Sequence, residues 1–202
     1  MAVNLRDDLE LLAAWNDGDE KAGNELFVRH FEAIYRFFRS KLESNVEDLV
    51  QQTFLACVRN RQTFHADSSF RAYLFQIARS KLYDALRQRL RTGIDVSMCT
   101  MADLRTSPST WMARKQEIEL LRAALERLPL ELQLAVELYY FEDQSASEVA
   151  LILELPEGTV RSRVRRAIES LRRAIEELAS SPEHARTVLA RLDELVDDRP
   201  DA

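Results

Sequence analysis

Apolar residues recur at helical spacing along most of the chain, and no segment shows the sustained alternation of a half-buried β-strand. The clearest stripe follows the i, i+3, i+4, i+7 rule and consists of Val46, Leu49, Val50, Thr53, Phe54, Cys57 and Val58. Only 4 glycines and 5 prolines occur among the 202 residues, and both residue types interrupt helices. The pattern therefore predicts an all-α protein.

Stop and cap signals divide this pattern into separate helices. The run Asn16-Asp17-Gly18-Asp19 is expected to end one helix and cap the next, and Ser68 or Ser69 to cap another. The first helix is expected to bury Leu5, Leu9, Leu12 and Ala13. The expected ranges are 5–16, 20–41, from about 45 onwards, 69–90, 111–127, 130–141, 145–153, 156–180 and 182–196.

A polar segment rich in Ser and Thr, residues 92–112, separates two groups of helices. We expect it to be a flexible linker, which could extend to roughly 70 Å, about two turns of duplex DNA at about 34–36 Å each. The predicted architecture is two small helical domains, residues 1–91 and 113–180, joined by this linker. Residues 181–202 form a C-terminal extension with an amphipathic helix and an acidic end.

Charge is distributed unevenly along the chain. The formal net charge is -6, yet the segment Gly158 to Ala174 carries six arginines and one acidic residue, Glu169. A basic patch on an acidic protein attracts phosphate locally while the whole molecule repels it. We therefore expect the free chain to bind DNA weakly, and more strongly when a partner holds it in place.

The segment from Ser145 to Leu178 has the pattern of a helix-turn-helix. Ser145 and Glu148 have the spacing of a capping box, in which each side chain bonds the other's backbone N–H. A short connector, Leu155 to Gly158, precedes a second helix with an apolar stripe. Its first turns also carry the residues that we call the reader face, Thr159, Arg161, Ser162, Arg165 and Arg166. Arginine can bind guanine through two hydrogen bonds, and hydroxyls suit phosphates or bases, so these residues predict a DNA reader.

Catalytic and metal-binding signatures are absent from the sequence. His30, His65 and His184 are scattered, and Cys57 and Cys99 lack the spacing of a zinc site. We therefore expect no enzyme activity, no cofactor and no metal. No signal peptide or membrane-spanning run is visible, which favours a cytoplasmic protein without membrane insertion and with two free thiols.

The C-terminal motifs resemble a known family. The runs Ser147-Glu148-Val149-Ala150 and Pro156-Glu157-Gly158-Thr159-Val160-Arg161-Ser162-Arg163, with Leu125 to Pro129 upstream, closely resemble the −35-reading domain of extracytoplasmic-function (ECF) sigma factors. The resemblance implies that the reader face binds the −35 promoter element.

The N-terminal half resembles the same family. Asp48 to Phe54 is similar to the segment that binds the clamp helices of RNA polymerase, which implies a docking face of Asp48, Gln51, Gln52 and Leu55. The run Phe70 to Arg79 is similar to the promoter-melting segment. Binding of the −10 element is thereby implied for His65, Ser69, Phe70, Arg71, Tyr73, Arg79, Ser80, Asp84 and Arg87, although Phe70 and Phe75 are also expected in the core. The family usually has other residues at Gln52, Tyr73, Ser80 and Asp143.

These resemblances imply an alternative sigma factor that would bind core RNA polymerase and promoter DNA and direct promoter-specific initiation. The family also implies an anti-sigma partner. Two other classes remain open: a helix-turn-helix repressor or activator, which would need a dimer surface and palindromic half-sites, and an enzyme fused to a DNA-binding tail. The sequence shows no coiled-coil heptads to support the first of these classes and no catalytic set to support the second.

Overall fold

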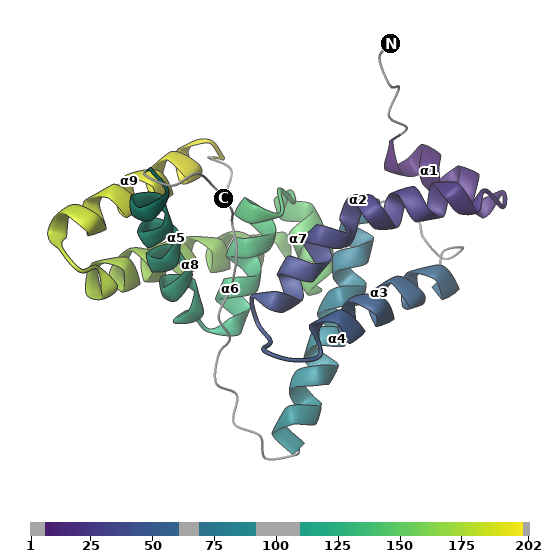
Figure 1. Cartoon of the computed structure of the whole chain (residues 1–202), viewed down its shortest axis with the longest axis horizontal. Helices are drawn as coiled ribbons and strands as arrows, with labels where there is room; N and C mark the ends of the chain where they lie inside the picture. Colours follow the sequence, from purple (N-terminus) through teal and green to yellow (C-terminus); the bar gives the residue numbers. More distant parts are fainter. Residues whose placement is uncertain (1–6, 61–68, 92–109, 200–202) are drawn as a thin grey trace, which may run out of the picture. The chain divides into compact units, whose positions relative to one another are not determined.

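The computed structural model describes residues 7–60, 69–91 and 110–199, and every regular element in these ranges is a helix (Figure 1). This confirms the all-α prediction for the described residues. The chain divides into two compact units, with the boundary after residue 99. Residues 92–109 of the predicted linker lie outside the described ranges. None of the described helices combines the length and the hydropathy needed to cross a membrane.

The N-terminal unit contains α1 (Asp8–Asn16), α2 (Glu20–Arg39), α3 (Val46–Asn60) and α4 (Phe70–Arg91). The long helix α2 packs against α1, α3 and α4, and α3 also packs against α4. The largest fully buried side chains come from α1, α2, α4 and the turn after α2: Leu11, Leu26, Ile34, Phe38, Leu42, Phe70, Leu74 and Phe75, with Leu82. The stripe predicted on α3 is buried from Val46 to Cys57.

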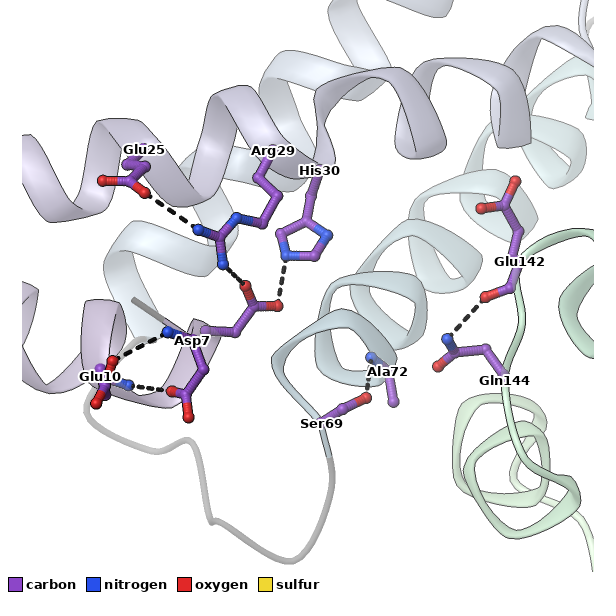
Figure 2. Close-up of polar contacts among 10 residues, drawn as sticks. Asp7, Glu10, Glu25, Arg29, His30, Ser69, Ala72, Glu142 and Gln144 are labelled. Carbon is purple, nitrogen blue, oxygen red and sulfur yellow. Dashed lines mark hydrogen bonds and ion pairs between the residues drawn. The ribbon is translucent and has the colours of Figure 1, made fainter. Parts of the chain in front are cut away.

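Helix α1 begins with a capping box. Asp7 Oδ1 accepts a hydrogen bond from the backbone N–H of Glu10 at 2.7 Å, and Glu10 Oε2 accepts one from that of Asp7 at 3.1 Å (Figure 2). The predicted apolar face of this helix was wrong in part. Leu5 lies outside the described residues. Leu12 is buried as predicted, but Leu9 and Ala13 are exposed, and Leu11 and Trp15 are buried in their place. Helix α1 therefore turns a different face toward α2 than the one predicted. The Trp15 ring packs directly over Gly23 of α2, so closely that a Cβ on residue 23 would not fit.

The C-terminal unit contains α5 (Thr110–Glu126), α6 (Leu130–Val136), the π-helix η2 (Glu137–Phe141), α7 (Ala146–Leu153), α8 (Glu157–Leu178) and α9 (Pro182–Asp197). Helix α8 is its centre and packs against α5, α6, α7 and α9. Its buried stripe is Val160, Val164, Ala167, Ile168, Leu171, Ala174 and Ile175, close to the stripe predicted from the sequence.

The predicted single helix 130–141 is in fact two elements. The backbone widens after Val136, and the N–H of Glu142 bonds the carbonyl of Glu137, five residues earlier, at 3.0 Å. Asp143 then takes a left-handed conformation with φ 53, which aspartate tolerates better than most residues. The π-turn shifts the register by one residue and so redirects the chain toward α7.

Candidate nucleic-acid interface

Helices α7 and α8 form the helix-turn-helix that the sequence predicted. Ser145 Oγ accepts from the N–H of Glu148 at 3.2 Å, and Glu148 Oε2 accepts from the N–H of Ser145 at 2.9 Å, which completes the predicted capping box. Glu154 ends α7 in a left-handed conformation with φ 55, as a helix C-terminus often requires. Pro156 then opens α8, so three residues separate the two helices.

The reader face lies on the first turns of α8. Arg165 and Arg166 are exposed, and Arg166 Nε also donates to the carbonyl of Ser162 at 3.2 Å. Arg161 is paired with Glu157 of the same helix at 2.7 Å, and Ser162 Oγ donates to the carbonyl of Thr159 at 2.9 Å. The side chains thus form a cationic surface whose arginines are long enough to reach base edges in a major groove.

The docking face lies on α3. Asp48, Gln51 and Leu55 are exposed, and Gln52 is half-buried. Gln52 Nε2 donates to Asp48 Oδ2 at 2.7 Å, across one helical turn. Leu55 remains 45% exposed although it is a large apolar residue, so this polar face has an apolar centre.

Helix α2 adds residues to this face that the sequence reasoning did not identify. Val28 and Phe31 are exposed, and with Phe54 and Leu55 they line an apolar hollow between α2 and α3. Their three-residue spacing, off the buried stripe of α2, was a signal that could have found them. The hollow widens the apolar surface around Leu55.

The residues implied in −10 binding divide into three groups. Ser69, Ser80, Asp84 and Arg87 are exposed, and Arg87 pairs with Asp84 at 3.0 Å. Arg71, Tyr73 and Arg79 are half-buried: the Arg71 and Arg79 guanidinium groups lie 5.8 and 5.3 Å from the Phe75 and Tyr83 rings, and the Tyr73 hydroxyl donates to the Asn60 carbonyl at 3.3 Å. Phe70 is in the core at 1% exposure, so its ring is not available to a base here. His65 lies outside the described residues.

The start of α4 agrees with the sequence expectation. Ser69 Oγ accepts a hydrogen bond from the N–H of Ala72 at 3.1 Å and so caps the helix (Figure 2). Helix α4 then exposes Ser80, Asp84, Arg87 and Arg91 to solvent. Arg87 and Arg91 are the cations on this polar surface, and cations of this kind can contact a nucleic-acid backbone.

Metal and thiol chemistry find no support in the described ranges. No group of His, Cys, Asp or Glu side chains there is arranged to hold a metal ion. Burial raises the pKa of the Cys57 thiol to about 12, so this thiol is protonated and unreactive at neutral pH. Cys99 lies outside the described residues.

Two family models match the chain, one in each unit. The model of Sigma-70 region 2 matches residues 26–92, and that of Sigma-70, region 4 matches residues 118–171. The first match contains the docking face and α4, and the second contains α7 and α8 as far as residue 171. Helix α9 lies beyond the second match.

Curated relatives match over most of their length. The ECF RNA polymerase sigma-E factor of Escherichia coli (strain K12) is 29% identical over 189 residues, covering 88% of this chain and 98% of that protein. The ECF RNA polymerase sigma factor SigM of Mycobacterium tuberculosis is 31% identical over 174 residues, covering 84% and 85%. A repressor or activator gains no support from these matches.

Solved structures share the fold. CnrH, in complex with the cytosolic domain of CnrY, has a TM-score of 0.61 at 24% identity and covers 86% of this chain and 99% of its own. The sigma factor RpoE of Bartonella quintana, in complex with the anti-sigma factor NepR, has a TM-score of 0.63 at 23% identity, covering 77% and 98%. The relatives and the two family models together show that the chain belongs to the ECF sigma factors, alternative sigma factors that direct transcription initiation by RNA polymerase.

Proposed function

We propose that the two units are two anchors of one promoter complex. The docking face on α3 binds core RNA polymerase, the exposed polar side of α4 contacts the −10 element, and the reader face on α8 contacts the −35 element. The observation that carries the proposal is the geometry of α7 and α8, which leaves Arg165 and Arg166 exposed on the first turns of a helix-turn-helix. The polymerase supplies the catalysis, and this chain supplies binding energy and promoter choice.

The proposed domain limits follow from this division. The N-terminal domain, residues 1–91, would bind core polymerase and the −10 element, and residues 92–112 would connect the units. The second domain, residues 113–180, would bind the −35 element, and residues 181–202 would form its C-terminal extension. A chain of -6 net charge with a local arginine cluster binds DNA weakly by itself. Attachment to polymerase raises the effective concentration of the reader at the promoter.

Transcription with purified core polymerase tests the proposal as a whole. Core polymerase plus this chain should initiate from a subset of a promoter library, and core polymerase alone should not. A chain that neither joins core nor directs initiation would contradict the proposal. The alternative of a repressor or activator predicts instead DNA binding that is independent of core.

The reader face has a sharper test in Arg166→Ala. Loss of a base contact should cost about 1–3 kcal/mol of promoter affinity and relax the preference at one −35 position. The matched control is Arg173→Ala, because Arg173 is also an exposed arginine of α8 but lies two turns further along. Equal losses for both variants would mean that Arg166 contributes charge alone.

An anti-sigma factor is the proposed regulator, acting where the polymerase acts, in the cytoplasm. Support comes from the solved complex of RpoE with the anti-sigma factor NepR, because RpoE has the same fold as this chain. A cognate anti-sigma factor should abolish initiation in the transcription assay. If it competes with core for the docking face, excess core polymerase should restore initiation.

A further inference from the structure

The C-terminal extension is built into the reader unit. Helix α9 packs against α5 and α8 and buries Ala185, Val188 and Leu192. Two ion pairs border this contact: Arg172 of α8 with Asp193 at 2.7 Å, and Arg191 with Glu117 of α5 at 3.0 Å. The family match ends at residue 171, so these contacts are additions to the matched domain.

Near its end, the extension contacts the segment that precedes the helix-turn-helix through Arg199. The Arg199 guanidinium donates a hydrogen bond to the backbone carbonyl of Tyr139, lies 4.6 Å from the centre of the Tyr139 ring, and pairs with Asp143 at 3.1 Å. Tyr139 is only 3% exposed and belongs to η2, in the last turn of the helical run. Carbonyls in a last helical turn lack intrahelical partners, so Arg199 satisfies an acceptor that the π-helix leaves open.

These contacts fall before and within the turn that leads into α7. Tyr139 precedes the turn, Asp143 lies within it in the left-handed conformation, and Ser145 is the N-cap of α7. Inside the turn, Gln144 is buried and its Nε2 donates to the Glu142 carbonyl at 2.9 Å (Figure 2). Arg199 therefore links the turn, through Asp143, to Tyr139 of η2. Gln144 stabilises the turn through a hydrogen bond within it.

The same contacts lie beside the reader face. Arg199, Ser145, Ser147 and Arg161 line one hollow, together with Tyr139, Ala146, Glu157 and Asp198. The start of α7, the first turn of α8 and the end of the extension thus border one hollow. A recognition helix that is held in its bound orientation loses less freedom on binding DNA.

We propose that Arg199 is a positioning residue of the −35 reader, which fixes the turn at residues 142–144 and thereby the start of α7 and the setting of α8. The proposal rests on the reader function proposed above. Arg199 acts through Tyr139 and Asp143 and does not itself touch DNA.

The test compares holoenzymes that carry wild-type, Arg199→Ala, Arg199→Lys and Arg191→Ala chains. For each, affinity is measured on a promoter selected by the wild-type holoenzyme, and on the same promoter with its −35 element scrambled. The ratio of the two affinities isolates the reader. Arg191→Ala is the matched control because Arg191 lies in the same extension but pairs with α5.

Arg199→Ala should lower this ratio by roughly three- to tenfold, as expected for the loss of one hydrogen bond of ordinary net strength, while the salt dependence of binding keeps its slope. Arg199→Lys should lower it less, because an ammonium group keeps the charge but lacks the planar fork. Arg191→Ala should keep the wild-type ratio. Backbone amides of residues 142–148 should exchange hydrogen faster in Arg199→Ala than in the wild-type chain.

Three results would overturn the proposal. An unchanged ratio with unchanged exchange would remove any role for Arg199 in the reader. A salt slope reduced by about one would assign Arg199 to a direct phosphate contact. Tighter binding by Arg199→Ala would make the extension a competitor of DNA. A wild-type holoenzyme that does not distinguish the two promoters would instead contradict the proposed function.

Discussion

Arg163 of α8 and Glu131 of α6 form an ion pair, with 2.8 Å between Nη2 and Oε2. The Arg163 side chain is 19% exposed and that of Glu131 is 62% exposed. Arg163 therefore turns inward toward α6, although its neighbours along the sequence belong to the reader face. Helix α8 thus carries one arginine that contacts α6 within the protein and others that are proposed to contact DNA. Single substitutions can separate these two roles.

The first prediction concerns this division. Arg163→Ala should lower the free energy of unfolding of the C-terminal unit by about 0.5–1 kcal/mol, since it removes an ion pair and some packing of the arginine stem. It should leave the −35 preference unchanged. Urea unfolding and promoter affinity measure the two effects. A loss of affinity as large as that of Arg166→Ala would place Arg163 on the DNA.

The second prediction concerns the docking face. Leu55→Ala should weaken binding to core polymerase by about 1–2 kcal/mol, because a large apolar side chain at the centre of an interface is often a main source of affinity. Leu9→Ala is the matched control, since Leu9 is 49% exposed on the same unit but belongs to α1, outside the docking face. Titration of labelled core polymerase measures both. Equal weakening would show that general apolar surface, and not this face, drives binding.

The sequence predicted those elements whose signals are local. The stripe on α3 and that on α8 were readable because each repeats over several turns, which fixes the buried face without knowledge of its partner. The capping box at Ser145 and Glu148 was readable because its two hydrogen bonds join residues three apart. The reader face followed from both signals, since a fixed core stripe leaves Arg165 and Arg166 outside.

Features that depend on contacts between distant residues were not readable. The nine-residue helix α1 is too short for its stripe to be decisive, and the packing of Trp15 over Gly23 sets its rotation. The π-turn η2 adds one residue to a helical turn but leaves the apolar pattern of the segment unchanged, so the sequence still predicts one continuous helix. The contact of Arg199 with Tyr139 joins residues sixty positions apart, and no local sequence pattern around either residue indicates the other as its partner.

The third prediction concerns Gly23. A Cβ at this position would lie 2.5–2.7 Å from atoms of the buried Trp15 ring, so Gly23→Ala forces α1 away from α2. We expect the N-terminal unit to lose about 1–3 kcal/mol, although alanine is by itself the better helix former. Fluorescence of Trp15 in a Trp111→Phe background reports the unfolding of this unit.

The control for this prediction is Gly158→Ala on α8, where nothing lies within 4 Å of the added Cβ. This change should leave the stability unchanged or raise it by up to about 1 kcal/mol, as helix propensity alone predicts. If Gly23→Ala leaves the N-terminal unit as stable as it is in the wild-type chain, the Trp15–Gly23 contact does not constrain the two helices.

The last prediction concerns Asp8, which joins α1 to α2. Its Oδ1 and Oδ2 lie 2.6 Å from Arg29 Nη1 and His30 Nε2, respectively. Burial raises the pKa of Asp8, but the hydrogen bonds and charges of His30 and Arg29 outweigh burial and hold that pKa below its ordinary value. The unfolded-state pKa is about 3.9, so the carboxylate stabilises the fold above that pH, and this stability is lost as the pH falls through the folded-state pKa.

Asp8→Asn should therefore lower the free energy of unfolding by about 1–3 kcal/mol at pH 7, because it breaks a charge-assisted network, and the deficit should shrink as the pH falls below about 4. Urea unfolding from pH 3 to 7, followed by Trp15 fluorescence in the Trp111→Phe background, measures the deficit. Asp84→Asn is the control, because Asp84 pairs with Arg87 on an exposed surface, where such pairs contribute little. A deficit for Asp8→Asn that is as large at pH 3 as at pH 7 would mean that the Asp8 charge does not hold α1 to α2.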